Sequence, residues 1–403
     1  MQQTMTTSDD RDGAGRIFLI FLRLGLTSFG GPVAHLAYFR DEFVSRRRWL
    51  SERAYADLVA LCQFLPGPAS SQTGIALGLF RGGYAGALAA WIGFTLPSAV
   101  LMILFALGIA HHQDFLSSGI LHGLKVVAVA VVAQAVVGMA RTLCTDAARI
   151  ALMLAAAAAA LFFPVPLAQI AIIVAAGLIG LLLKPAQTMP HEPLPATIGH
   201  RSGAGWLGIF FLLLATLPVL AHMFPVPALM AADAFYRAGA LVFGGGHVVL
   251  PLLQSEVVHP GWIDAGTFMA GYAAAQAMPG PLFTFATFLG AAMPGFGSPW
   301  LGGLICLLAI FVPAFLLVTG SLPFWETLRR NPKAQSALAG INAAVVGLLL
   351  AAWYQPVWQT GVLDARDVVL ALAAFVALTF GRQPPWLVVA GGALAGWLLT
   401  ALP

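Results

Sequence analysis

Phe29-Gly30-Gly31-Pro32 and Gln63-Phe64-Leu65-Pro66-Gly67-Pro68 are the stretches that decide the fold, because both recur in the second half of the chain. The recurrences are Phe243-Gly244-Gly245-Gly246 and Gln276-Ala277-Met278-Pro279-Gly280-Pro281. The offset is 214 residues at the first block (243 minus 29) and 213 at the second (279 minus 66), so the loop between them differs by one residue. Two matched blocks in the same order predict a duplicated unit.

The composition predicts a membrane protein. Hydrophobic residues make up 60% of the chain and charged residues 9%, against about 25% charged in an ordinary soluble domain. Apolar runs of about 20 residues recur, among them Tyr84 to Ala110, Leu121 to Ala140 and Trp206 to Phe224. Because a bilayer interior cannot hydrogen-bond free backbone groups, such runs are expected to be helices, and the fold class to be an all-α polytopic membrane protein.

Other features of the composition exclude further classes. Residues 1 to 15 are polar and carry both signs of charge, so we expect no removable signal peptide. The three cysteines, Cys62, Cys144 and Cys306, are far apart and predict neither a metal cluster nor a disulfide framework. A net charge of +4 with scattered arginines gives no support for nucleic-acid binding. We predict no cofactor.

Hydropathy divides the chain into about thirteen apolar segments. Residues 1–183 hold six of them as the first copy, 184–205 form a polar, Pro-rich linker, 206–224 form an unmatched segment, and 225–403 hold the second six. A single extra crossing between the copies turns the second upside down relative to the first. The sequence therefore predicts an inverted-topology repeat.

The arginines predict the orientation. The loop after the first segment carries Arg40, Arg46, Arg47, Arg48 and Arg53, whereas its counterpart, residues 254–266, has no Lys or Arg. Basic loops stay in the cytoplasm. The positions of Lys and Arg in the loops agree best with this rule if the first two segments of each copy are re-entrant hairpins, with a cytoplasmic N-terminus and an external C-terminus. A full first crossing with an external N-terminus also satisfies the basic loop and remains an alternative.

The repeated blocks are expected to break helices at membrane depth. Pro-Gly-Pro removes two backbone donors around a residue with unrestricted φ, so a continuous helix cannot pass through it. Half-helices that start after such breaks direct free N–H groups at one spot, which is a site for an anion. Matched breaks in a duplicated membrane chain indicate a transporter's binding site, although Pro and Gly also merely bend membrane helices. The predicted substrate-binding backbone consists of Gly30, Gly31, Pro32, Pro66, Gly67, Pro68, Gly244, Gly245, Gly246, Pro279, Gly280 and Pro281.

Five polar side chains are added to this predicted site. Arg23 and Arg237 each lie six residues before a Phe-Gly-Gly block, and a cation at membrane depth is expected to serve function unless it reaches the interface. Lys125 is a lone cation in an apolar run. Gln63 and Gln276 precede the two Pro-Gly-Pro breaks and can donate to an oxyanion or cap freed carbonyls.

Three further residues are candidates for proton coupling. His247 directly follows the second glycine block and has a side chain that titrates near neutral pH, although a lone His is more often a neutral, hydrogen-bonded residue. Glu42 and Glu256 are matched between the copies. Both are expected in loops, where a solvated acid is the simpler interpretation.

Together these blocks resemble the chromate ion transporter family in its long, two-domain form. The resemblance covers about residues 16–141 and 234–354, and rests on the Phe-Gly-Gly block, the arginine-rich loop followed by Trp49, the Gln-x-x-Pro-Gly-Pro block and their repeats. It implies a bacterial inner-membrane protein that expels chromate, confers resistance and is linked to the proton motive force. The second copy has Gly246 in place of Pro32 and lacks the basic loop, as an inverted repeat predicts.

Electrostatics favours export. Chromate is largely a dianion at neutral pH, so an inside-negative cell gains about 4.6 kcal/mol per 100 mV by expelling it, at about 2.3 kcal/mol per charge. The expected partners are chromate or a similar oxyanion, protons and the lipid bilayer, and a homodimer is left open. Transport of sulfate or another tetrahedral oxyanion is the main alternative. A channel, a scramblase and a membrane-embedded enzyme are more distant ones, and no His, Asp and Glu group stands at catalytic spacing on one face.

Overall fold

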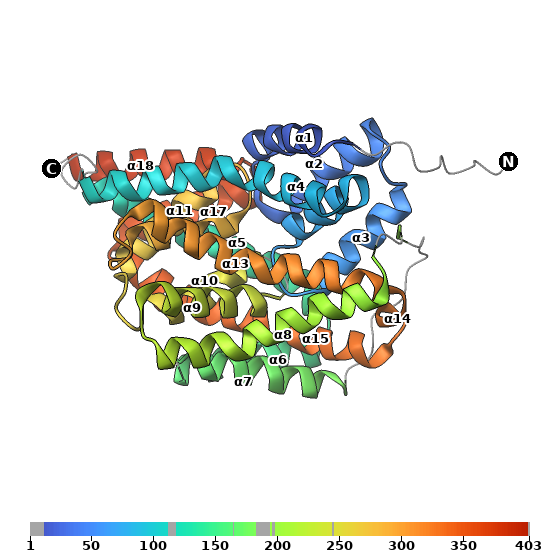
Figure 1. Cartoon of the computed structure of the whole chain (residues 1–403). Coiled ribbons are helices and arrows are strands. Elements are labelled where there is room, and N and C mark those ends of the chain that lie inside the picture. Colours follow the sequence, from blue (N-terminus) through green and yellow to red (C-terminus); the bar gives the residue numbers. More distant parts are fainter. Residues whose placement is uncertain are drawn as a thin grey trace.

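The structure is a computed structural model that describes residues 12–111, 118–163, 165–182, 194–195, 198–243 and 246–401. In these ranges all regular elements are helices, which confirms the predicted all-α class. Five stretches are long and apolar enough to cross a membrane: 69–110, 119–143, 200–223, 299–329 and 332–361. The chain is therefore a polytopic helical membrane protein (Figure 1).

The helices of the first copy end where the sequence predicts breaks. Phe29 and Gly30 separate the first two helices, and residues 65–68 separate the third and fourth. The elements are α1 (Ala14–Thr27), α2 (Gly31–Arg40), the π-helical turn η1 (Asp41–Arg46), α3 (Glu52–Phe64), α4 (Ala69–His111), α5 (Ser118–Leu143), α6 (Ala147–Phe162) and α7 (Pro166–Gly180). Within α4 the backbone leaves helical geometry at Gly82 and Gly83, where Gly83 has a φ of 62°. The apolar segment predicted from Tyr84 thus begins directly after this break.

The second copy repeats this order after α8 (His200–Met223), which begins six residues before the predicted unmatched segment. Its elements are α9 (Pro227–Leu241), η2 (Gly246–Val248), α10 (Val249–Val257), α11 (Ala265–Ala277), η3 (Leu282–Thr284), α12 (Phe285–Ala292), α13 (Pro299–Ser321), η4 (Leu322–Phe324), α14 (Trp325–Arg329), α15 (Pro332–Ala352), η5 (Trp353–Trp358), α16 (Gln359–Gly361), α17 (Ala365–Thr379) and α18 (Pro385–Ala401). The predicted apolar segments therefore all contain helices.

Side-chain contacts show that the chain reverses direction at the breaks. In the first copy, Phe21 on α1 packs against Phe39 on α2, with ring centroids 5.6 Å apart. In the second copy, Phe268 on α11 packs against Phe285 on α12 at 5.0 Å. Residues before and after a break can meet in this way only if the two helices fold back on each other. The broken segments are helical hairpins.

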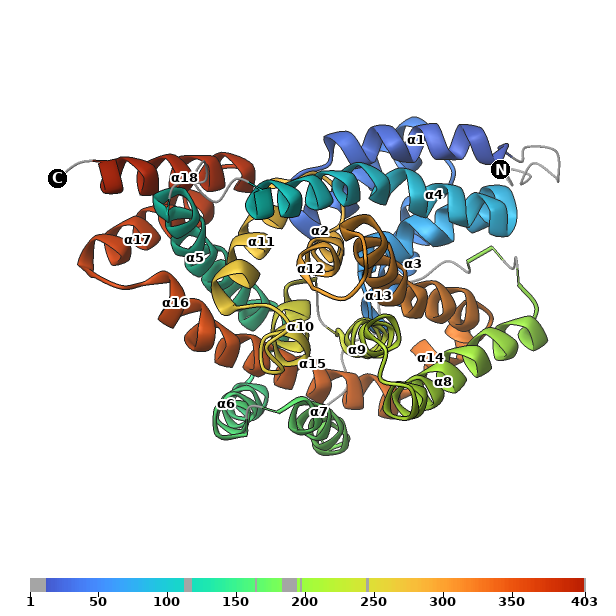
Figure 2. The ribbon, with the colours of Figure 1, turned by 60° about the vertical axis from the view of Figure 1, so that its left-hand side comes forward.

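Helices of each copy pack against helices of the other copy. The α5 helix of the first copy packs against α17 and α18 of the second, while α15 of the second packs against α6 and α7 of the first (Figure 2). Small residues bring these helices close, because a Cβ added to Gly123 would lie 2.1 Å from the carbonyl oxygen of Gly392, and one added to Gly340 would lie 2.1 Å from that of Ala176. Neither copy packs as a separate unit.

Four of the predicted crossings are short. The α6, α7, α17 and α18 helices have 16, 15, 15 and 17 residues. At about 1.5 Å per residue, each is shorter than the roughly 30 Å hydrocarbon core of a bilayer. The α8 helix is of full length and lies on the outside of the bundle, with most of its surface exposed (Figure 1).

Candidate functional site

The four breaks meet through two reciprocal backbone hydrogen bonds. The N–H of Gly67 donates to the carbonyl oxygen of Val242 at 2.6 Å, and the N–H of Gly280 donates to that of Ser28 at 3.0 Å. Gly67 and Gly280 are matched positions of the repeat, as are Ser28 and Val242. Each Pro-Gly-Pro break of one copy is therefore bonded to the residue that precedes the Phe-Gly-Gly block of the other.

Only glycine suits the centre of each Pro-Gly-Pro break. Gly67 has a φ of 121° and Gly280 a φ of 95°, in the left-handed region that side chains disfavour. A Cβ would lie 2.9 Å from the amide nitrogen of Gln72 at Gly67, and 2.8 Å from the hydroxyl of Ser98 at Gly280. Glycine is thus required at the centre of each break by the backbone conformation and by the close approach of Gln72 or Ser98.

The Phe-Gly-Gly blocks also approach each other. A Cβ at Gly246 would lie 3.2 Å from the ring of Pro32, so the two blocks are in contact. Gly30 and Gly31 have φ values of 100° and 78° and start α2. Gly244 and Gly245 fall outside the described residues. The structure therefore brings together most of the predicted backbone site.

Directly after Pro66-Gly67-Pro68, the first turn of α4 carries buried polar side chains that the sequence reasoning did not single out. They are Ser70, Ser71, Gln72 and Thr73, none more than 3% exposed. The first hydrogen bond of α4 runs from the N–H of Gln72 to the carbonyl oxygen of Pro68, which leaves the earlier amides without a helical partner. The Ser-Ser-Gln-Thr run next to a predicted break was the signal that could have revealed them.

These side chains are only partly satisfied by the protein. The amide of Gln72 donates to the carbonyl oxygen of Pro66 at 2.8 Å, so Gln72, and not Gln63, caps the break. The hydroxyl of Ser71 and the amide oxygen of Gln72 make no hydrogen bond within the described residues. Gln63 itself is exposed. Buried polar groups are costly without partners, so a polar ligand at this turn would be favoured.

A second group of buried polar residues lies beside the first turn of α4. His35 is 1% exposed, and its Nδ1 is 3.4 Å from the hydroxyl of Ser70. The Nε2 of His35 and the hydroxyls of Ser28 and Thr95 make no hydrogen bond to the described part of the chain. The backbone of Ser28 lies close to the His35 ring. These groups come from the end of α1 (Ser28), from α2 (His35) and from α4 (Ser70 and Thr95).

The second copy does not repeat the polar side chains that follow the break in the first copy. Its matched segment is Leu282-Phe283-Thr284-Phe285, and the hydroxyl of Thr284 is bonded to the carbonyl oxygen of Pro281 at 2.8 Å. Gln276 is buried and lies 3.3 Å from Nδ1 of His247, which is 2.9 Å from the hydroxyl of Tyr272. His247 is therefore a hydrogen-bonded residue of this cluster. The backbone site is symmetric, but its side chains are not.

The matched arginines Arg23 and Arg237 lie in different surroundings. Arg23 is exposed on α1. The guanidinium of Arg237 is held by Asp233 at 2.8 Å and by Glu256 at 2.9 Å. The difference arises because the first copy has Leu19 where the second has Asp233, so Arg23 lacks an acid one turn earlier on its own helix.

The expectation that Glu42 and Glu256 lie in solvated loops is wrong for both residues. Glu42 lies in η1, is 7% exposed and accepts hydrogen bonds from Arg46 at 2.6 Å and Arg47 at 2.7 Å. Glu256 lies in α10 and binds Arg237. Because a buried carboxylate needs compensating charge, both glutamates are placed where arginines reach them.

Lys125 lies on α5, and its side chain reaches the start of α11. A Cβ at Gly266 would be 2.7 Å from its Nζ. Burial alone would raise the pKa of Asp264, but hydrogen bonds from Thr267 and Gly266 and the charge of Lys125 hold it below its usual value. Lys125 thus contributes to the electrostatics of this helix start.

Two copies of broken helices whose breaks meet at a shared point are typical of secondary transporters. The sequence profile of the chromate transporter family matches residues 15–181 and 229–397, and the chain belongs to this family. It is 28% identical to a chromate transport protein of Pseudomonas aeruginosa, over 95% of this chain and 92% of the relative. It is 26% identical to a chromate transport protein of Cupriavidus metallidurans, over 96% of this chain and 93% of the relative. An uncharacterised transporter of Methanocaldococcus jannaschii is 28% identical, over 87% of this chain and 88% of the relative. No solved structure matches the chain.

Proposed function

We propose that this protein exports chromate across the bacterial inner membrane, with the anion bound where the four breaks meet. The observation that carries the proposal is the first turn of α4, which lies next to the reciprocal bonds between the copies and where the hydroxyl of Ser71 has no hydrogen-bond partner among the described residues. Dipoles at a helix start and neutral donors stabilise an oxyanion without a buried cation. The relatives named chromate transport protein support chromate as the substrate.

The proposed site is asymmetric. We assign the oxyanion contacts to Ser70 and Ser71 on α4, because the matched residues of the second copy are Phe283 and Thr284. An apolar phenylalanine cannot donate to an anion, and the hydroxyl of Thr284 is already bonded. The second copy then serves mainly as the partner that holds the break in place through Val242 and Gly280.

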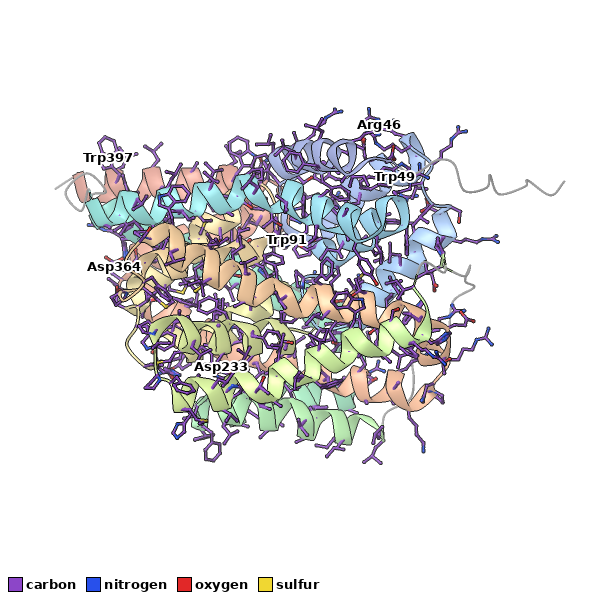
Figure 3. All side chains as sticks on the ribbon, viewed as in Figure 1. Arg46, Trp49, Trp91, Asp233, Asp364 and Trp397 are labelled. Atoms are coloured by element: carbon purple, nitrogen blue, oxygen red, sulfur yellow. The ribbon has the colours of Figure 1, made fainter. Side chains whose placement is uncertain are left out.

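The proposed orientation places the N-terminus in the cytoplasm and the C-terminus outside. Arg46 and Trp49 lie at one end of the molecule, and Asp364 and Trp397 lie at the other (Figure 3). Arg329, the last residue of α14, binds Asp57 of α3 at 3.1 Å, one turn after Arg53 of the basic loop. Arginine-rich ends are retained on the cytoplasmic side.

Proton exchange as the driving force and resistance to chromate are parts of this proposal. Sulfate transport is the second candidate, since its tetrahedral dianion has nearly the shape and charge of chromate and a site built from backbone amides and hydroxyls would suit both.

Uptake of chromate, sulfate and molybdate by everted membrane vesicles tests the proposal. We expect saturable chromate uptake that needs the intact chain and that collapses with the proton gradient. Vesicles from cells without the protein provide the background. Uptake of sulfate with chromate excluded would assign the protein to the alternative, and unsaturable flux of all three anions would indicate a channel.

A further inference from the structure

The hairpin of α9 and α10 contains a cluster in which two carboxylates share one arginine. Arg237 donates from Nε to Oδ1 of Asp233 at 3.0 Å and from Nη2 to Oδ2 at 2.8 Å. It also donates from Nη1 to Oε1 of Glu256 at 2.9 Å and from Nη2 to Oε2 at 3.0 Å. The guanidinium is therefore bound along two edges, and it ties α9 to α10.

This cluster has a net charge of −1 when both acids are ionised. The side chains of Asp233 and Glu256 are 10% and 12% exposed, so water compensates little of that charge. Two carboxylates that share a site do not both ionise as readily as separate ones. An acid with an uncompensated charge inside a membrane protein is a candidate for a functional role.

The surrounding helices do not supply the missing positive charge. The elements packed against α9 and α10 are α7, α8, α13, α15 and η2. Their ionisable side chains are His200, Arg201, His222, His247, Cys306 and Lys333. In the described part of the chain none of these forms an ion pair with Asp233 or Glu256, and the charges that act on Glu256 are those of Arg237 and Asp233. Figure 3 shows Asp233 on α9, within the body of the molecule.

The first copy has the opposite balance. Leu19 occupies the position of Asp233, and Glu42, which matches Glu256, is bound by Arg46 and Arg47. Because two arginines compensate the charge of this single acid, the first copy has no excess negative charge for a proton to neutralise. The excess acid is thus a property of the second copy and does not follow from the repeat.

The cluster is connected to the candidate anion site through α9. Arg237 lies on α9, which ends at Leu241, and the next residue, Val242, accepts the hydrogen bond from Gly67. A change in how Arg237 is held would therefore be transmitted along little more than one helical turn to the break.

We propose that Asp233, Arg237 and Glu256 form the proton-binding site of this transporter, an inference that rests on the proposed chromate transport. One proton adds to one carboxylate and changes the net charge of the cluster from −1 to 0. The protonated acid accepts fewer hydrogen bonds from Arg237, which loosens the hairpin of α9 and α10. Release of the proton on the other side restores both ion pairs.

Reconstituted full-length protein in liposomes tests this site with two assays. The first is exchange of labelled chromate for unlabelled chromate, which needs no net proton movement, and the second is chromate accumulation driven by an imposed pH gradient. We expect Asp233→Asn, Asp233→Leu and Glu256→Gln to keep exchange and to lose gradient-driven accumulation. Asp233→Leu reproduces the residue found in the first copy. The control Glu52→Gln removes an exposed acid that pairs with Arg40 and should leave both activities unchanged.

The outcomes separate this inference from the proposed function. Gradient-driven accumulation at the wild-type level in all three variants would overturn the proton site while transport stands. Loss of exchange and accumulation together, in variants that insert normally, would also overturn it, because the cluster would then be needed for transport itself. Exchange by the wild type without any gradient-driven accumulation would reject proton coupling, whereas absence of exchange in the wild type would reject the proposed function and this inference with it.

Discussion

Gly280 donates its backbone N–H to the carbonyl oxygen of Ser28 at 3.0 Å, across more than half of the sequence. Its matched residue, Gly67, makes the equivalent bond to Val242 at 2.6 Å. These bonds satisfy the backbone N–H groups of the two break glycines, and in each bond the acceptor carbonyl belongs to the other copy. A rearrangement of one copy therefore changes the environment of the break in the other, which is what a shared binding site in a transporter requires.

Substitution of the break glycines should abolish transport. In Gly67→Val and Gly280→Val, a side chain would have to adopt a left-handed φ, at a cost of roughly 1–2 kcal/mol, and would also press on Gln72 or Ser98. We expect normal membrane insertion with loss of chromate uptake, measured in everted vesicles. Gly138→Ala is the control, because a Cβ there meets nothing within 4 Å. Full uptake by both valine variants would show that Pro-Gly-Pro is only a bend.

Removal of the Ser71 hydroxyl should weaken chromate binding. Ser71→Ala deletes a buried donor at the start of α4 that has no protein partner among the described residues, so stability should change little while KM for chromate rises several-fold, as loss of about 1 kcal/mol predicts. Thr284→Ala is the matched variant of the second copy, in which the hydroxyl is bonded to Pro281. Its KM should stay at the wild-type value. Equal effects in the two variants would contradict the assigned asymmetry.

The matched arginines should differ in their contribution to stability. Arg237→Gln leaves two poorly exposed carboxylates without their cation, and breaking such a pair costs about 3–5 kcal/mol. Arg23→Gln removes an exposed side chain and should cost much less. Thermal unfolding in detergent and the amount of inserted protein measure both. A stable Arg237→Gln with raised KM would instead restore Arg237 to the substrate site.

Single cysteines should report the inversion of the two copies. Ser45 and His259 are both exposed, and they follow matched hairpins. In the otherwise native chain we expect Ser45→Cys to react with an impermeant maleimide only from the cytoplasm, and His259→Cys only from outside. The three native cysteines are buried, which keeps the background low. Reaction of both from the same side would exclude an inverted repeat.

Much of the fold could be predicted because it depends on local properties of the chain. Long apolar runs must form helices in lipid, and the Pro-Gly-Pro and Phe-Gly-Gly blocks must interrupt them wherever they fold. The helix ends at Phe64 and Thr27 therefore lie where the sequence predicts them. The packing of α6 and α7 against α15, and of α17 and α18 against α5, could not be predicted. Apolar helices of similar composition carry no local sequence signal that identifies the helix against which each one packs.

The sequence by itself determined that this is a duplicated helical membrane protein with four matched breaks, because hydropathy and backbone stereochemistry act within a few residues. Only the tertiary structure decided which groups meet: Gly67 with Val242, Gly280 with Ser28, and Arg237 with two acids while Arg23 faces outward. Matched positions had suggested equal roles for the two arginines. Ion pairing depends instead on which side chains come within a few ångströms of each other, and a single difference, Leu19 against Asp233, was enough to separate them.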